Sequence, residues 1–364
     1  MNITKSGRNA KFECLRIISM IMVVFLHALS KSELLVNLTM ENMKLPNTWI
    51  AWILEVLCVG AVNIFMLISG YFLVESEFKL SRLIELVAQT VFYSIGGFAL
   101  CYATGIIQTG DLTIYFILDN IFPIHMEMFW FITAYVLVYI LQPVLAKGIK
   151  AISKRRFQTV LILCLIYECF LKSLVPIRFT SDTKGYSFFW YVIVFMIGAY
   201  FRLYGFVFLS KPHRGMIIYC ISSAVNLALV VAVQYVVVYM EHLEDLINYS
   251  LEYNHILVLA ASVGIFAAFA TMKDRQNGIG KVICYLSPMA LGVYLFHENL
   301  SVRYEWQHWL GLRTIADKPP IVFLGRIVLA VLIVYLTGTL VDYIRIWLFK
   351  FAKYMIGKAK RNKV

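Results

Sequence analysis

The chain has 364 residues, of which 61% are hydrophobic and only 15% carry a charge, and its mean hydropathy is +0.76. Soluble domains carry charges on about a quarter of their residues, so this composition excludes an ordinary soluble fold and predicts a membrane protein with several spans. The net charge of +12 does not indicate nucleic-acid binding, because the basic residues lie between apolar segments and not on a soluble module with stacking aromatic residues.

Apolar segments follow one another from Cys14 to Phe349, without a polar block long enough to fold independently. We therefore expect a single transmembrane domain over residues 1–364. With about 20 apolar residues per crossing, the pattern predicts an all-α bundle of about ten spans. Their approximate bounds are 13–31, 50–74, 84–108, 128–146, 159–176, 187–203, 215–240, 254–272, 283–302 and 321–349.

The distribution of Lys and Arg predicts how the bundle is oriented. If the N-terminus is cytoplasmic, the inner connections and tails hold 21 of these residues and the outer connections hold 7. Cytoplasmic loops are enriched in Lys and Arg, so both termini are predicted to be cytoplasmic, in a multi-pass protein of the cell membrane. The basic run KAISKRR at 150–156 and the C-terminal tail are interpreted as topology signals and contacts to anionic lipids.

Arg16 and His27 stand in the first span with ten residues between them. Eleven helical steps are three turns plus roughly 20°, so both side chains share one face about 16 Å apart. Each has a structural alternative. Glu13 lies three residues before Arg16 and can form an ordinary ion pair with it. His27 has no carboxylate three or four residues away, but a lone helical histidine is more often a hydrogen-bonded packing residue.

A second polar group lies toward the outer end of the ninth span, where His297 is followed by Glu298. Charged and titratable groups are costly within a membrane, so each needs a partner or a function. The predicted topology puts these groups at a depth similar to that of His27, which lets two imidazoles and a carboxylate converge on one outward-facing cavity. His125 and Trp130 flank the outer end of the fourth span and are further candidates, although Trp130 also fits the aromatic belt of a membrane interface.

At these residues the chain resembles the membrane-bound acyltransferase 3 family, the integral-membrane O-acyltransferases of bacterial surface polysaccharides and related acceptors. The family hallmark in the first helix is matched by Arg16 and His27. The stretch NIFMLISGYF, the FWF of 129–131 and the LGVYLFH ending at His297 follow in the expected order. One departure is Glu85, which stands three residues after Arg82 where the family often has a second arginine. Members with an appended extracellular esterase-like domain differ from this chain, in which we expect none.

The resemblance implies transfer of an acyl group, with acetyl-CoA as the expected donor and a surface glycan, or its lipid-linked precursor, as the acceptor. It implies His27 as the general base and Arg16, with Arg82, as contacts to coenzyme A. His297, Glu298, Trp130 and His125 are the candidate acceptor-binding residues. No metal and no nucleic acid are expected.

Two other classes of protein remain as alternatives. One is a proton-coupled secondary transporter, in which intramembrane His and Glu residues relay protons. Against it, the sequence has no evident inverted repeat and no matched pair of spans broken by Gly or Pro. The other is a flippase-like or sensory membrane protein without catalysis.

Overall fold

The computed structural model describes residues 8–175, 183–240, 246–274 and 277–361, and this part of the chain is helical, without a β-strand. The predicted all-α fold is confirmed. The helices are α1 (Ala10–Ser30), α2 (Pro46–Cys58), α3 (Ala61–Leu73), α4 (Leu80–Ala103), α5 (Ile114–Ile121), α6 (Trp130–Ala151), α7 (Lys154–Leu165), α8 (Lys172–Leu174), α9 (Phe188–Tyr204), α10 (Pro212–Tyr239), α11 (Ile256–Thr271), α12 (Gly278–Leu286), α13 (Ala290–His297), α14 (Trp306–Trp309) and α15 (Pro320–Arg361).

Helix starts follow from local sequence. Pro46, Pro212 and Pro320 each stand at the beginning of a helix, where proline's missing N–H is not needed. Ser153 and Ser187 cap α7 and α9, because each hydroxyl accepts a hydrogen bond from the backbone N–H three residues later.

Nine helical segments in the described residues are long and apolar enough to cross a membrane, and α9, with 17 residues, is a shorter apolar helix. Together these ten segments correspond to the ten spans predicted from the sequence. Helix α9 lies in the interior of the protein, since all twelve residues from Trp190 to Phe201 are buried. The two chain ends and residue 176, the predicted end of the fifth span, lie outside the described residues.

The second, fifth and ninth spans are not continuous α-helices, a feature that the sequence did not predict. The fifth changes from α7 to α8 through a π-helical stretch at Ile166–Leu171. The second span changes from α2 to α3 at Val59 and Gly60, and the ninth changes from α12 to α13 through a 3-10 turn at Ser287–Met289. Pro288 explains the break in the ninth span, since it cannot donate a helical hydrogen bond. The argument that a transporter would have a matched pair of broken spans therefore no longer counts against that class. The distinction between an enzyme and a transporter depends on the site and on the family.

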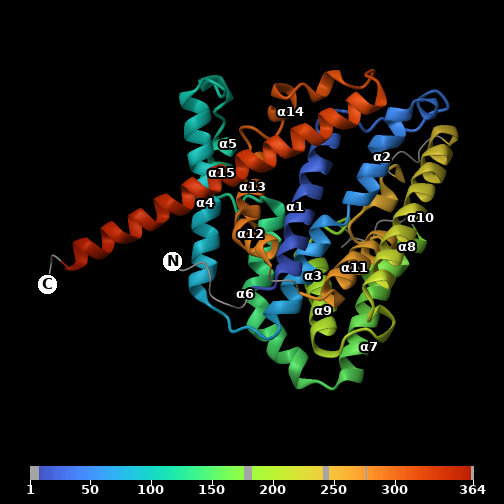
Figure 1. Ribbon diagram of the computed structural model, residues 1–364, viewed down its shortest axis with the longest axis horizontal. Coiled ribbons are helices and arrows are strands. Elements are labelled where there is room, and N and C mark those ends of the chain that lie inside the picture. Colours follow the sequence, from blue (N-terminus) through green and yellow to red (C-terminus); the bar gives the residue numbers. More distant parts are fainter. Residues whose placement is uncertain (1–7, 176–182, 241–245, 275–276, 362–364) are drawn as a thin grey trace.

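Helix α1 occupies the middle of the bundle (Figure 1), where it contacts α2, α3, α11, α12, α13 and α15. Helices α4 and α5 stand on one side and α10 on the other, while α15 runs obliquely across the bundle and extends beyond it. We call the end at which α1 begins the basic end, because Lys11, Arg82 and Lys154 are near it, and the opposite end the far end.

Glycine allows α3 and α9 to cross in close contact. A Cβ atom at Gly70 would lie 2.1 Å from the carbonyl oxygen of Phe195, and one at Gly198 would lie 2.2 Å from the carbonyl oxygen of Leu67. Small residues at such crossings let two backbones approach, which is how membrane helices gain packing energy. The NIFMLISGYF stretch therefore has a packing role at Gly70.

We expect Gly70→Ala to reduce the amount of folded protein sharply, because the added methyl group must push α3 away from α9. Overpacking of this kind costs about 1–3 kcal/mol or more. The measurement is the thermal unfolding midpoint and the monodisperse yield in detergent. Gly96→Ala is the matched control, since a Cβ at Gly96 meets nothing within 4 Å. Equal stability of the two variants would contradict the close crossing.

Candidate active site

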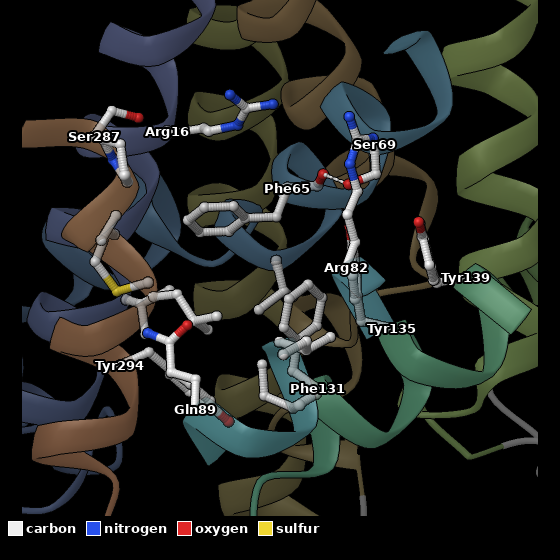
Figure 2. Close-up of a pocket in the computed structure, with 18 of the residues that line it drawn as sticks. Arg16, Phe65, Ser69, Arg82, Gln89, Phe131, Tyr135, Tyr139, Ser287 and Tyr294 are labelled. Carbon is white, nitrogen blue, oxygen red and sulfur yellow. Dashed lines mark hydrogen bonds between the residues drawn. The ribbon is translucent and has the colours of Figure 1, made fainter. Parts of the chain in front are cut away.

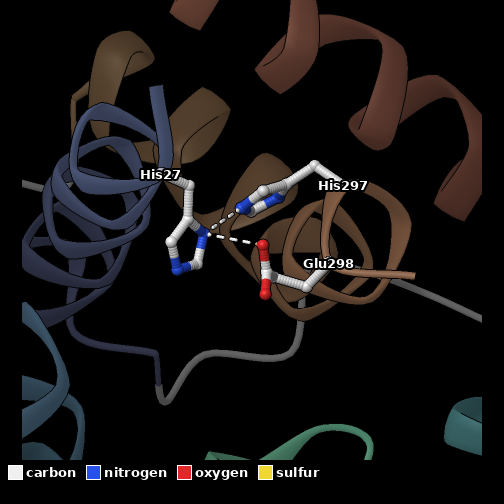
Figure 3. Close-up of side chains that lie close together, drawn as sticks. All are labelled: His27, His297 and Glu298. Carbon is white, nitrogen blue, oxygen red and sulfur yellow. Dashed lines mark hydrogen bonds and ion pairs between the residues drawn. The ribbon is translucent and has the colours of Figure 1, made fainter. Parts of the chain in front are cut away.

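Three of the candidate residues meet at the far end of the bundle. His27 is in the last turn of α1, His297 ends α13, and Glu298 follows directly. Nδ1 of His27 lies 2.9 Å from Nε2 of His297 and 3.2 Å from Oε1 of Glu298 (Figure 3). The two histidines are 270 positions apart in the sequence, so the fold creates this contact.

The hydrogen bonds of His297 determine which nitrogen of His27 is free. Nδ1 of His297 lies 2.6 Å from the carbonyl oxygen of Val293. A carbonyl only accepts hydrogen bonds, so this nitrogen carries hydrogen, and Nε2 of neutral His297 has a lone pair. We therefore assign the hydrogen of neutral His27 to Nδ1, from which it is donated to His297 and toward Glu298. Nε2 of His27 keeps its lone pair, as a general base requires.

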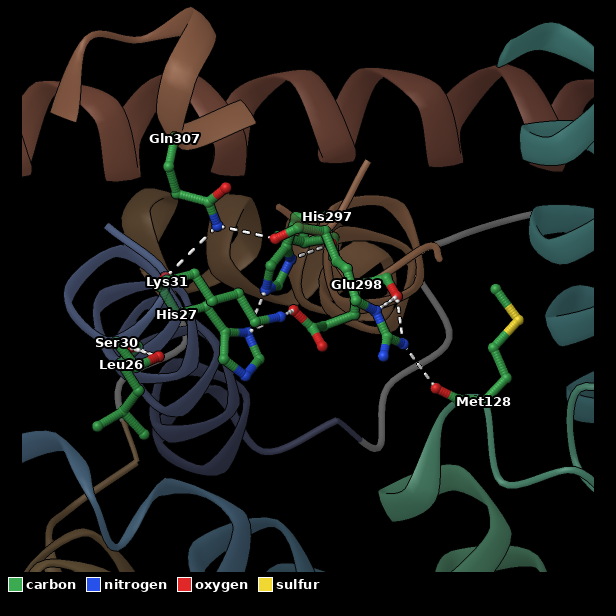
Figure 4. A network of polar contacts seen from close by, with 10 residues as sticks. Leu26, His27, Ser30, Lys31, Met128, His297, Glu298 and Gln307 are labelled. Carbon is green, nitrogen blue, oxygen red and sulfur yellow. Dashed lines mark hydrogen bonds and ion pairs between the residues drawn. The ribbon is translucent and has the colours of Figure 1, made fainter. Parts of the chain in front are cut away.

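Glu298 also forms an ion pair with Lys31, which contacts the same carboxylate oxygen that faces His27 (Figure 4). The carboxylate is thus balanced by a neighbouring ammonium group while His27 is neutral. When His27 accepts a proton, the adjacent carboxylate favours the imidazolium through its opposite charge. Lys31 also lies 5.2 Å from the centre of the Tyr304 ring, which limits the movement of its side chain.

The connection after α13 positions this group. Arg303 donates hydrogen bonds to the carbonyl oxygens of Glu298 and Met128 through Nη2, at 3.0 and 2.8 Å. Gln307, which is fully buried, donates to the carbonyl oxygen of Arg303 at 2.9 Å and contacts that of His27 at 3.5 Å. These bonds fix the end of α1 and the residue after α13 relative to each other.

One nitrogen or oxygen atom from each of His27, His297 and Glu298 lies within 4.8 Å of the others, which is a spacing that a metal ion could use. The hydrogen-bond pattern favours a different interpretation. Nε2 of His297 already accepts the hydrogen of His27, and the Lys31 ammonium already occupies Oε1 of Glu298. We therefore interpret the group as a proton-transfer site.

A cavity of about 410 Å³ lies between the basic end and this site (Figure 2). Its lining is formed by α1, α3, α4, α6 and the α12–α13 break, and includes Arg8, Glu13, Arg16, Met20, Val23, Val62, Phe65, Ser69, Leu73, Arg82, Glu85, Leu86, Gln89, Phe131, Ile132, Tyr135, Tyr139, Ser287, Pro288, Ala290, Leu291 and Tyr294. Three arginines (Arg8, Arg16 and Arg82) and two glutamates (Glu13 and Glu85) line it, and the remaining wall is mainly apolar.

The cavity extends toward the histidines. It is lined by Val23 and Tyr294, which are one helical turn before His27 and His297 respectively. The Tyr294 ring lies 6.1 Å from the His297 ring. A ligand that fills the cavity from the arginines therefore ends close to the imidazole pair.

Arg16 contributes to this cavity although Glu13 is its partner. Its Nη1 lies 2.6 Å from Oε1 of Glu13, and Oε2 of Glu13 accepts a hydrogen bond from Ser287. The Arg16 side chain remains 32% exposed, so it keeps donors for a ligand. The ion pair predicted from sequence and the position in the cavity are thus compatible. Arg82 lies on α4, across the cavity from α1, and Figure 2 shows both guanidinium groups toward the same end.

The other two candidates, His125 and Trp130, do not contact the imidazole pair. His125 is exposed before α6 and, within the described residues, has no hydrogen bond, ion pair or ring contact with the imidazole pair. Trp130 belongs to an aromatic group described below. Sequence reasoning missed Lys31 and Arg303, which it treated only as charges of outer connections; the position of Lys31 four residues after His27 was the available signal.

Comparison with known protein families gives one match. The acyltransferase domain that defines the acyltransferase 3 family matches residues 9–339. The chain therefore belongs to the acyltransferase 3 family and is a membrane acyltransferase. Neither the curated proteins nor the solved structures that were compared gave a match.

Proposed function

We propose that the chain is a bacterial membrane O-acetyltransferase that moves an acetyl group from cytoplasmic acetyl-CoA to a hydroxyl of a cell-surface glycan. The favoured acceptor is a capsular polysaccharide or its lipid-linked repeat unit, and the favoured location is the plasma membrane. The observation that carries the proposal is the contact between His27 and His297 one helical turn beyond an arginine-lined cavity, with hydrogen bonds that leave Nε2 of His27 its lone pair.

In this proposal His27 acts as the general base. Its Nε2 takes the proton of the acceptor hydroxyl while the hydroxyl oxygen attacks the thioester carbonyl. The new C–O bond forms, the C–S bond breaks, and the proton passes to the departing thiolate of coenzyme A. A positioned imidazole contributes typically about 10²- to 10⁴-fold to such a step, and the carboxylate of Glu298, 3.2 Å away, supports the charged intermediate state of His27.

The donor is proposed to enter from the basic end. Phosphate groups of coenzyme A match the guanidinium groups of Arg16 and Arg82, because arginine binds phosphate with paired, charge-assisted hydrogen bonds. The apolar part of the cavity suits the uncharged arm that carries the thioester. The Lys and Arg distribution supports a cytoplasmic basic end, which leaves the far end for an acceptor outside.

The experiment that tests the proposal compares the O-acetyl content of surface glycans in a strain without the gene and in the same strain carrying it. Mild alkali releases the acetate for measurement, and immunoblotting checks the amount of protein in the membrane. Restored acetylation supports the proposal. Unchanged glycan acetylation with normal protein levels rejects the acceptor class, and a proton-dependent solute flux in vesicles would favour the transporter.

Arg16→Ala is expected to raise the KM for acetyl-CoA, because it removes a charge-assisted contact to phosphate. Such hydrogen bonds contribute about 1.5–3 kcal/mol, or roughly 10- to 100-fold in affinity. The measurement is initial acetyl-transfer rate in membranes at varied acetyl-CoA. Arg155→Ala is the matched control, since Arg155 is an exposed residue at the basic end outside the cavity lining. An unchanged KM for Arg16→Ala would leave Arg16 with only its ion pair to Glu13.

A further inference from the structure

A group of aromatic rings lies beside the far end of the site. Trp130 begins α6, Tyr186 precedes α9, and Tyr253 precedes α11. The Trp130 ring centre is 4.5 Å from that of Tyr186 and 5.6 Å from that of Tyr253, and the Tyr186 and Tyr253 centres are 5.0 Å apart. We call these three residues the aromatic cluster. Tyr186 is 47% exposed, so one side of the cluster is open.

The backbone before Tyr186 is held in an unusual conformation. Lys184 and Gly185 have φ angles of 58° and 79°, in the left-handed region that lysine rarely adopts. The carbonyl oxygen of Lys184 accepts a hydrogen bond from the backbone N–H of Tyr253. A Cβ atom at Gly185 would lie 2.7 Å from the backbone nitrogen of Asn254. A strained backbone conformation therefore holds Tyr186 against the other two rings. Such strain is frequent at binding sites.

A carboxylate accompanies the rings. The side chain of Glu55, on α2, has no hydrogen bond or ion pair with any part of the chain that the structure describes, and its Oε2 is buried. It is close enough to interact electrostatically with the hydroxyl groups of both Tyr186 and Tyr253. A buried carboxyl oxygen without a hydrogen-bond partner is costly, and a ligand that forms a hydrogen bond with it removes that cost.

The aromatic cluster is connected to the imidazole site through the segment before α6. Arg303 bridges the carbonyl oxygens of Glu298 and Met128, and Met128 is two residues before Trp130. Phe129 lies between Met128 and Trp130 in the sequence. Its ring centre is 5.9 Å from that of Tyr294, a residue that lines the cavity. The cluster is therefore joined to the imidazole site by the short segment from Met128 to Trp130.

We propose that the aromatic cluster and Glu55 form the subsite for a sugar ring of the acceptor, with the ring stacked on the open face of Tyr186 and two sugar hydroxyls donating to Glu55. The inference rests on the proposed function. It assigns the acceptor chemistry: an uncharged pyranose unit with neighbouring hydroxyls. Aromatic faces and a few placed polar groups are the ordinary composition of small-molecule sites.

The ring arrangement distinguishes this from two other interpretations. A cage for a quaternary ammonium ion needs several ring faces turned toward one point, whereas the Trp130 and Tyr253 rings are stacked on each other, 18° from parallel. An aromatic belt at the membrane interface explains exposed rings. It does not explain an unpaired carboxylate beside them or the left-handed backbone at Lys184.

The test measures acetyl transfer to the glycan isolated from the strain without the gene, together with the rise in melting temperature caused by acetyl-CoA. Tyr186→Ala and Glu55→Gln are expected to lower transfer about tenfold and to keep the wild-type response to acetyl-CoA. Tyr186→Phe, which keeps the ring, is expected to retain most transfer. The matched control is Phe189→Ala, whose exposed ring, at 44%, follows in the same segment outside the cluster.

Each outcome decides the inference. It is overturned if Tyr186→Ala and Glu55→Gln both transfer at the wild-type rate, if Phe189→Ala is equally impaired, or if choline, used as a competitor, inhibits transfer where methyl glycosides do not. It is supported if methyl glycosides compete in the wild type and lose this effect in Tyr186→Ala. Failure of the proposed function is recognised separately, because the wild-type protein would then transfer no acetyl group to any glycan.

Discussion

His27→Ala is expected to abolish glycan acetylation while the protein still binds acetyl-CoA. The variant removes the only nitrogen that the hydrogen-bond pattern leaves free for a substrate proton at this site, Nε2 of His27. Loss of a general base lowers the rate about 10²- to 10⁴-fold. The measurement is acetyl transfer in membranes, with the melting temperature recorded with and without acetyl-CoA. The arginines of the cavity are untouched, so stabilisation by the donor should persist.

His213→Ala is the control for His27→Ala, because His213 is an exposed histidine at the basic-end start of α10. It should acetylate as the wild type does. If His27→Ala also acetylates normally at equal abundance, the base is another group and the assignment is wrong. If His27→Ala loses the response to acetyl-CoA as well, then His27 has a binding role that the general-base proposal does not include.

The fold was largely predictable because its signal is repeated along the chain. Each crossing needs about 20 apolar residues, and composition alone determines most of that pattern. The interruptions at Gly60 and Pro288 were less visible, because glycine and proline also occur in unbroken membrane helices when neighbouring groups satisfy the backbone. Helix α15 extends beyond residue 349, where the predicted span ends. It continues past the apolar run because the lysines that follow also favour helix formation.

The site was predictable only in part, since its contacts join distant segments. Sequence spacing could show that Arg16 and His27 share a helix face, but not which residues of other helices face them. His297 and Glu298 were candidates because of their predicted depth in the membrane and because of the family resemblance. The structure brings both into contact with His27. The Lys31 ion pair with Glu298 needed the three-dimensional arrangement.

The aromatic cluster shows the same limit on sequence reasoning. Trp130 alone is an ordinary interfacial tryptophan. It becomes a candidate binding residue only because the structure packs Tyr186 and Tyr253 against it. These two residues are 56 and 123 positions later in the sequence. Likewise Glu55 was one of many polar groups in the spans, and its lack of a partner became visible only once its neighbours were known.

His297→Leu is expected to lower kcat with an unchanged KM for acetyl-CoA. A loss of about 10- to 100-fold is expected, by analogy with residues that orient the imidazole ligands of metal sites. Leucine cannot accept the hydrogen of His27 Nδ1, so Glu298, at 3.2 Å, becomes the remaining acceptor. The imidazole then loses the partner that fixes its ring orientation and tautomer. His297→Gln, whose amide oxygen can accept the same hydrogen, should recover part of the rate. The measurement is kcat and KM for acetyl-CoA in membranes for both variants.

The comparison of the two His297 variants separates positioning from packing. His297 is almost completely buried, so both substitutions disturb the core, and the melting temperature will record that cost. If the rates follow melting temperature instead of the ability to accept a hydrogen bond, His297 acts through packing alone. If glutamine restores rate without restoring stability, the hydrogen bond to His27 is what matters. In that case the relay from Val293 through His297 to His27 sets the free nitrogen that begins acetyl transfer.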